Sequence, residues 1–227
     1  MFIRQDNTLK WKWIGVGAII VLAFVVAGVL GLDKFLYQII HRADCNVWTQ
    51  SESLLCSGAI GIDKIFSTKM WLIASFVAVV VFFVYKAIKN ENDFRYAFVK
   101  IKNSYVFYVF CSVWAAVLTT GVLKVLIGRT RPVLFDALGK TDFEPFVFDF
   151  VFNSMPSGHC AASFAGLVML GMLFPRMKWL TWTLAIIIAI SRVYVGAHWP
   201  SDVLVGAFIG MVFADITKSV LKKINSK

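Results

Sequence analysis

Several ionisable residues of this 227-residue chain lie within or beside strongly apolar stretches, where a charge is costly and requires an explanation. They are Lys124, Arg131, His159, Arg192, His198 and Asp202. Lysine and arginine can bind the oxygens of a phosphate group, and histidine can attack phosphorus or transfer a proton. The set therefore predicts a site for chemistry on a phosphate group.

Two of the cations, Lys124 and Arg131, stand seven residues apart at the end of an apolar stretch. Seven residues are close to two helical turns, so both side chains can project from one helix face before Pro132 stops the helix. Lys124 lies too deep in the apolar stretch to be a simple interfacial charge. Arg129, by contrast, is interpreted as a charge that snorkels to the membrane surface.

The segment Pro156-Ser157-Gly158-His159 directly precedes another apolar stretch. Proline and serine favour the start of a helix, and glycine leaves backbone N–H groups accessible. The free N–H groups at a helix N-terminus form a natural cradle for phosphate, although a simple helix cap is the alternative interpretation. A second histidine at this point, His159, is able to protonate a leaving oxygen.

A histidine and an aspartate, His198 and Asp202, lie four residues apart after a turn through Gly196. At helical spacing the carboxylate can hold one ring nitrogen of the histidine and leave the other directed at a substrate. A purely structural histidine is the usual alternative, and it is the interpretation preferred for His41. With Arg192 nearby in sequence, His198 is instead predicted to be a nucleophile oriented by Asp202.

The sequence contains no cluster of carboxylates suited to Mg²⁺ and no set of cysteines and histidines suited to Zn²⁺. We therefore expect no metal ion and no other cofactor. Lysine and arginine would then meet the charge of the transition state in place of a metal ion.

The composition is that of an integral membrane protein, because 59% of the residues are hydrophobic and only 16% are charged. Lysine and arginine outnumber aspartate and glutamate by 23 to 13, which in a soluble protein would raise the question of nucleic acid binding. Here the charges lie between apolar stretches. We therefore expect a phosphorylated membrane lipid and the bilayer as partners, and no nucleic acid.

Six apolar stretches predict an all-α fold, a bundle of six membrane-spanning helices in a single domain over residues 1–227. The stretches cover residues 13–32, 70–85, 104–127, 160–174, 179–196 and 203–221. Several are shorter than the roughly 20 residues that cross a hydrocarbon core, so polar residues must extend those helices. The first stretch is interpreted as a retained helix, because it is longer than a signal-peptide core and no small-residue cleavage site follows it.

The positive charges of the connecting segments predict the orientation in the membrane. With the N-terminus in the cytoplasm, the cytoplasmic segments carry 14 lysines and arginines and the outer segments carry seven. Both ends are therefore expected in the cytoplasm, and all six chemistry-bearing residues fall on the outer side. In the first outer loop, residues 33–69, an apolar pattern predicts a short amphipathic helix on the membrane surface. Cys45 and Cys56 share this loop, and the sequence leaves open whether they form a disulfide bond.

The second outer loop, residues 128–154, is rich in phenylalanine. Its phenylalanines are Phe143, Phe146, Phe148, Phe150 and Phe152. They could form a half-buried strand or a loop that dips into the lipid interface, and the loop is favoured because an open strand edge is costly in hydrocarbon. We predict that this segment borders the entry path of a lipid.

Three motifs follow one another along the chain: Lys124-x6-Arg131-Pro132, then Pro156-Ser157-Gly158-His159, then Ser191-Arg192-x5-His198-x3-Asp202. Together they resemble the signature of the type 2 phosphatidic acid phosphatase (PAP2) family, which the vanadium-dependent haloperoxidases share. All three motifs match without a substitution. The resemblance covers the chain from the third apolar stretch to the start of the sixth.

The resemblance implies a six-helix bundle with a phosphate site made by Lys124, Arg131, Ser157, Gly158 and Arg192. It implies that His198 forms a phosphohistidine, that Asp202 orients it and that His159 protonates the leaving group. Bacterial members of this size act on phosphatidate, phosphatidylglycerol phosphate, undecaprenyl pyrophosphate or lipid A. The expected location is the bacterial cytoplasmic membrane, with the site on the periplasmic side.

Other functions fit some of these residues. A lipid-to-lipid phosphotransferase would use the same site with an acceptor hydroxyl in place of water, and it is the main alternative. Haloperoxidases share the signature but are soluble, and a non-enzymatic anion-binding scaffold or transporter would not need the pair His198 and Asp202. We therefore expect a metal-independent lipid phosphatase, whose headgroup, acyl specificity and oligomeric state the motifs leave open.

Overall fold

The computed structural model of the protein describes residues 8–42, 45, 53–89 and 94–225. This part of the chain is helical and contains no β-strand. In chain order the elements are α1 (Trp11–Ala27), η1 (Gly28–Leu32), α2 (Asp33–Ile40), α3 (Leu54–Ile65), α4 (Thr68–Lys89), α5 (Phe94–Lys102), α6 (Tyr105–Ile127), α7 (Pro132–Leu138), η2 (Phe150–Phe152), α8 (Gly158–Leu173), η3 (Pro175–Met177), α9 (Lys178–Tyr194) and α10 (Pro200–Asn225).

Five helical stretches are long and apolar enough to cross a membrane: Trp11–Ile40, Thr68–Lys89, Tyr105–Ile127, Pro175–Tyr194 and Pro200–Asn225. Helix α8 is also apolar but is only 16 residues long. The prediction of an all-helical membrane protein is thus confirmed. The count of six spans stays a prediction, because α8 is shorter than a typical crossing.

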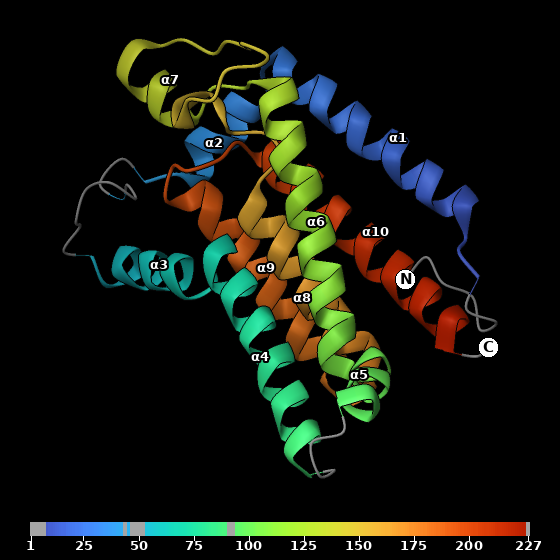
Figure 1. Ribbon diagram of the computed structural model, residues 1–227. Coiled ribbons are helices and arrows are strands. Elements are labelled where there is room, and N and C mark those ends of the chain that lie inside the picture. The colour runs from blue at the N-terminus through green and yellow to red at the C-terminus, as the bar shows by residue number, and fades with distance from the viewer. Residues whose placement is uncertain (1–7, 43–44, 46–52, 90–93, 226–227) are drawn as a thin grey trace.

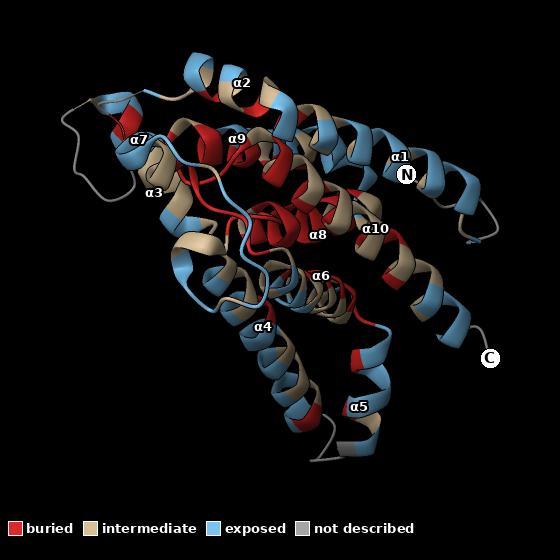
Figure 2. Cartoon of the chain, turned by 90° about the horizontal axis from the view of Figure 1, so that it is seen from above, coloured by how far each residue is buried: buried red, intermediate tan, exposed pale blue. Residues whose placement is uncertain are grey.

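Helix α8 lies at the centre of the bundle and packs against α6, α9 and α10 (Figures 1 and 2). It is rich in glycine, alanine and serine, and 12 of its 16 residues are buried. On α10, a side chain at Gly206 would overlap the carbonyl oxygen of Ser157, and one at Gly210 would crowd that of Ala161. Small residues on both helices therefore let the two backbones approach closely, which fixes the position of the site residues that they carry.

Helices α1 and α2 follow each other across a kink at η1, where Gly31 leaves the helical conformation with a φ of 131°. No residue of α1 is buried, and its exposed side chains are largely apolar, as expected for a lipid-facing helix. Beyond the bend, α2 turns Asp33 and Tyr37 into the protein. The residues of the predicted amphipathic helix are therefore helical and form α2 beyond the kink, and the location of this helix on the membrane surface stays a prediction.

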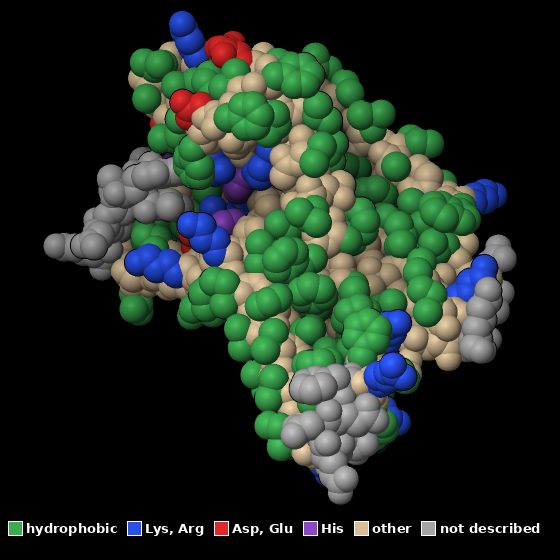
Figure 3. All heavy atoms as spheres, in the orientation of Figure 1, with side chains coloured by type: hydrophobic (Ala, Val, Ile, Leu, Met, Phe, Trp, Pro, Cys, Tyr) green, Lys and Arg blue, Asp and Glu red, His purple; other side chains and the backbone are tan. Residues whose placement is uncertain are grey.

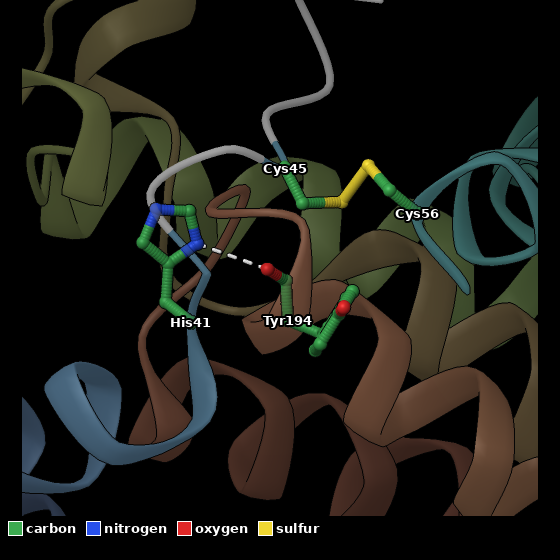
Figure 4. The surroundings of a disulfide bond; sticks show 4 residues. All are labelled: His41, Cys45, Cys56 and Tyr194. Carbon is green, nitrogen blue, oxygen red and sulfur yellow. Dashed lines mark hydrogen bonds between the residues drawn. A yellow bond between two sulfur atoms is a disulfide. The ribbon is translucent and has the colours of Figure 1, made fainter. Parts of the chain in front are cut away.

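The segment between α2 and α4 contains a helix, α3, which lies beside the start of α4 and at a steep angle to it (Figure 1). A disulfide bond between Cys45 and Cys56 ties the first turn of α3 to the segment that follows α2 (Figure 4). Both cysteines are fully buried and pack against Val195 and Ala197, in the turn between α9 and α10. The bond that the sequence left open is thus present, and it holds α3 against the turn that carries the third motif.

His41 anchors the end of α2 to the same turn. Its Nδ1 lies 2.9 Å from the carbonyl oxygen of Tyr194 (Figure 4), and its ring stacks on Tyr37 with the centroids 4.7 Å apart. These contacts support the structural interpretation of His41.

The chain turns sharply between α6 and α7. Helix α6 ends at Ile127, and Gly128 takes the left-handed conformation with a φ of 61°. A side chain at Gly128 would overlap the carbonyl group of Glu144, so only glycine fits this turn. The prediction that one helix carries both predicted cations was therefore wrong: Arg131 is extended, and Pro132 begins α7 instead of ending α6.

The phenylalanine-rich segment forms a loop that ends in the short helix η2. Its backbone makes an isolated bridge between Phe143 and Arg129, and the described residues show no strand there. Phe146 and Phe148 are 69% and 83% exposed. The preference for a loop over a strand is confirmed, while contact of the loop with lipid stays a prediction.

Candidate active site

The eight predicted site residues meet at the end of the bundle where α6 ends and where α8 and α10 begin. A cavity of about 460 Å³ is lined there by Lys124, Arg131, Gly158, His159, Arg192 and His198. Ser157 and Asp202 are fully buried and lie outside this lining. Figure 3 shows the cavity as a hollow in which cationic side chains surround histidine, with hydrophobic side chains along its edge.

Two cations from different elements converge on one backbone oxygen. Lys124 Nζ donates to the carbonyl of Asn153 at 2.5 Å, and Arg131 Nη2 donates to the same oxygen at 3.2 Å. Arg131 also donates to the carbonyl of Ala197 at 3.0 Å and lies over the ring of Phe150, 3.9 Å from its centroid. The two cations that the sequence paired are thus adjacent, although the chain reverses direction between them.

The N-terminus of α8 opens beside these cations. Ser157 is the residue before the helix, and its backbone N–H donates to the backbone carbonyl of Asp202 at 2.9 Å. A side chain at Gly158 would lie 3.2 Å from the hydroxyl of Thr68 and 3.8 Å from the side chain of Lys124. Glycine therefore lets both groups come close to a helix end that carries partial positive charge.

His198 is 2% exposed and lies beside Asp202, with its Nδ1 3.7 Å from Asp202 Oδ2. That distance is too long for a hydrogen bond. The two side chains do not have the spacing of one helical turn, because His198 precedes α10. Asp202 Oδ2 instead accepts from the hydroxyl of Ser154 at 2.5 Å and from the backbone N–H of Trp199 at 3.0 Å. The predicted pair is brought together, but without a direct hydrogen bond.

Arg129 is buried, so the prediction that it snorkels to the membrane surface was wrong. It is 4% exposed, and its guanidinium bridges Asp202 Oδ1 and Asp33 Oδ2 at 2.8 Å each. It also donates to the hydroxyl of Ser201 at 2.7 Å. The turn at Gly128 directs the side chain inward, where it joins α2 to the carboxylate that lies beside His198.

A second acidic residue, Asp63 near the end of α3, was missed by sequence reasoning. Its carboxylate forms an ion pair with Arg192 Nη1 and lies 3.2 Å from His159 Nε2. On the other side of the ring, His159 Nδ1 lies 3.5 Å from the hydroxyl of Thr68. Neither Asp63 nor Thr68 belongs to a motif, so no spacing in the sequence pointed to them.

The cavity keeps His198 neutral and Arg131 charged near neutral pH. Burial lowers the pKa of His198 well below its usual value of 6.5, and the charges of Arg131, Lys124 and Arg192 lower it further. Burial also lowers the pKa of Arg131, to about 10, against the opposing effect of Asp202. An uncharged imidazole among cations retains a free electron pair while its surroundings attract an anion.

Among the described residues, no three or more histidine, cysteine, aspartate or glutamate side chains are grouped so that they could hold a metal ion. The charged groups that line the cavity are mainly nitrogen donors, which suit a phosphate group.

Comparison with known proteins shows related sequences. A lipid A 1-phosphatase from Rhizobium johnstonii is 34% identical over 163 residues, which cover 70% of this chain and 65% of that protein. An undecaprenyl-diphosphatase from Sulfolobus acidocaldarius is 35% identical over 97 residues, which cover 42% of this chain and 45% of that protein. The chain thus spans just under two thirds of the first relative and less than half of the second.

The fold has a solved counterpart, the crystal structure of the transmembrane PAP2-type phosphatidylglycerolphosphate phosphatase from Bacillus subtilis. The TM-score is 0.62 at 22% sequence identity, over 93% of this chain and 96% of that one. In addition, residues 103–226 match the PAP2 superfamily, and they include all three motifs. This chain therefore belongs to the PAP2 superfamily.

Proposed function

We propose that this protein is a membrane lipid phosphatase that works without a metal ion and forms a phosphohistidine on His198. One observation carries the proposal: a buried, uncharged His198 lies beside Asp202 in a cavity whose lining includes Lys124, Arg131 and Arg192. The cations Lys124, Arg131 and Arg192 would bind the phosphate oxygens, as would the N–H groups at the start of α8.

In the first step, His198 attacks phosphorus while the bond from phosphorus to the leaving oxygen breaks. His159 gives its proton to that oxygen, so a phosphomonoester releases its lipid as an alcohol and a pyrophosphate releases a lipid phosphate. In the second step, His159 accepts a proton from a water molecule, whose oxygen attacks phosphorus as the bond to His198 breaks. Inorganic phosphate then leaves, and both histidines return to their starting states.

The proposed substrate is a phosphomonoester or pyrophosphate of a membrane lipid. The relatives named as a lipid A 1-phosphatase and an undecaprenyl-diphosphatase make these two lipids the first to test. We propose that the site faces the periplasm and that both chain ends are cytoplasmic. The disulfide bond beside the site supports this orientation, because such bonds persist in oxidising compartments.

The test is phosphate release by the detergent-purified protein in EDTA, with lipid A, undecaprenyl pyrophosphate, phosphatidylglycerol phosphate and phosphatidate as substrates. We expect release to survive chelation, and the best substrate will identify the headgroup. Loss of release in EDTA that Mg²⁺ or Zn²⁺ restores would contradict the metal-free mechanism. Label that moves between two mixed lipids, without free phosphate, would instead identify a phosphotransferase.

The acid limb of the pH profile is expected well below pH 6.5, because the pKa of His198 is lowered from that value. A lowered pKa keeps the imidazole unprotonated, and therefore nucleophilic, as the pH falls through 6.5. Measurement of kcat/KM across the acidic range checks this prediction. In Arg131→Met, loss of one cation should move the limb toward neutral pH; a limb already near pH 6.5 in the wild type would contradict the assignment.

Replacing Phe146 and Phe148 by serine is expected to raise KM for a long-chain lipid several-fold and to change KM little for a short-chain soluble analogue. Both side chains are exposed, and Phe150 of the same segment lines the cavity. The matched control is Phe98→Ser, at an exposed position on α5 at the other end of the bundle (Figure 1). An equal rise in KM for both substrates would contradict a role of this segment in lipid entry and would indicate that it only packs against the site.

A further inference from the structure

We infer that Asp63 is a positioning residue for His159, and that its carboxylate favours the protonated form of that histidine for release of the leaving group. The inference rests on the proposed function. It concerns a carboxylate that lies outside the three motifs, on the helix of the first outer loop.

The contacts of Asp63 join three elements at the cavity. From α3, its carboxylate reaches Arg192 of α9 and His159 of α8, and its side chain is 14% exposed. Thr68 of α4 lies on the opposite edge of the imidazole, 3.5 Å from Nδ1. The ring of His159 is thus held between an acid at Nε2 and a hydroxyl at Nδ1.

Helix α3 is held firmly enough to fix the carboxylate. The disulfide bond at Cys56 ties its first turn, and Ala59 and Ile60 pack against the turn between α9 and α10. Asp63 follows one turn later, on the side of α3 that reaches the cavity. The helix therefore brings a negative charge to a fixed place in the cavity.

That charge matters because most of the titratable side chains that line the cavity with His159 are cationic or can become so. They come from α4, α6, the segment before α7, α9 and the segment before α10, and they are Lys69, Lys124, Arg131, Arg192 and His198. A general acid must carry its proton before the leaving oxygen develops charge, and cations oppose a second positive charge on the imidazole. A carboxylate 3.2 Å from Nε2 opposes that repulsion.

The two histidines of the site thus differ in the charge of the carboxylate beside them. Near His198, the charge of Asp202 is already neutralised by Arg129, so the imidazole can remain uncharged. Near His159, the carboxylate of Asp63 contacts both the imidazole and the guanidinium of Arg192. When a phosphate group binds Arg192, the charge of Asp63 becomes available to His159, so substrate binding would strengthen the acid.

The test compares Asp63→Asn and Asp63→Glu with the wild type on two substrates. With a lipid phosphomonoester the leaving group is a basic lipid alkoxide, which needs a proton from the acid. With a lipid pyrophosphate the leaving group is a lipid phosphate, which needs that proton less. For Asp63→Asn we expect kcat on the monoester to fall about 10- to 100-fold, with a much smaller loss on the pyrophosphate. The basic limb of its kcat profile should move to lower pH, because His159 then loses its proton more easily. Asp63→Glu should keep that limb near its wild-type position.

Two further variants separate this role from others. In the His159→Ala background, Asp63→Asn should cause little additional loss, because the two residues act through one proton. Glu144→Gln, which removes a carboxylate on the same outer face outside the cavity, should leave the pH profile unchanged.

Several outcomes would overturn the inference alone. Each of them requires that the wild type releases phosphate and that His198→Ala does not. The outcomes for Asp63→Asn are an equal loss of kcat on both substrates, a basic limb of the kcat profile that does not move, or a lower KM. The last result would mean that the carboxylate only occupies the phosphate position. Absence of release from every lipid by the wild type would instead overturn the proposed function, and this inference with it.

Discussion

Replacing His198 with alanine is expected to lower kcat for phosphate release by about 10⁴-fold or more, because the change removes the proposed nucleophile. The side chain lines the cavity, so its removal enlarges an existing space and does not leave charges unpaired. The variant should therefore elute from size-exclusion chromatography like the wild type. The measurement is phosphate release from the best lipid, together with acid-labile labelling of the protein by a ³²P-phosphorylated substrate.

A matched control for this change is His41→Ala, at a histidine that lies on the same side of the bundle but outside the cavity. His41 contacts Tyr194 and Tyr37 but does not line the cavity, so we expect some loss of stability and retained turnover. A folded His198→Ala protein that still releases phosphate at a rate near that of the wild type would refute the covalent mechanism. Turnover without labelling of the wild type would point to direct attack by water.

Replacing Arg129 with alanine is expected to destabilise the protein by about 3–5 kcal/mol, the usual cost of breaking a buried ion pair from one side. The change leaves Asp33 and Asp202, which are 1% and 0% exposed, without their shared cation. Two buried carboxylates then repel each other, and one of them must take up a proton. The measurement is the unfolding transition of the detergent-purified protein, followed by heat or denaturant.

Two control variants accompany this prediction: one keeps the positive charge at residue 129, and the other removes an arginine elsewhere. Arg129→Lys keeps the charge but lacks the fork that reaches both carboxylates, so its loss should be intermediate. Arg176→Ala removes an exposed arginine near α9 and should change stability by no more than about 0.5 kcal/mol. A loss for Arg129→Ala as small as that for Arg176→Ala would show that the network contributes little to stability.

Much of the fold could be predicted because each long helix is apolar along its own length. A run of apolar residues fixes a membrane-spanning helix by itself, so α4, α6, α9 and α10 fall close to their predicted ranges. The helix ends were harder to predict, because they depend on contacts with other segments. Gly128 ends α6 against the backbone of Glu144, and nothing near residue 128 in the sequence reveals that neighbour.

The motif residues of the site could be predicted because their types and spacing repeat a known signature. Arg129, Asp33 and Asp63 could not be assigned, because their roles arise only when distant segments meet. Arg129 stands two residues from Arg131, and at that spacing a side chain can face either the lipid interface or the interior. The turn at Gly128 decides between them, and the partner at Asp33 comes from the first helix.

The charges around the cavity come from two different parts of the chain. The segment that matches the PAP2 superfamily supplies Lys124, Arg129, Arg131 and Arg192, whereas one further lysine of the cavity lining, Lys69, comes from α4. Apart from Asp202, the carboxylates that pair with these cations in the described residues are Asp33 and Asp63, both from the first 102 residues. The region from α1 to α5 thus provides the counter-charge of the three-motif segment. Exchanging that region between relatives would change the electric field acting on a bound phosphate even when every motif residue is kept.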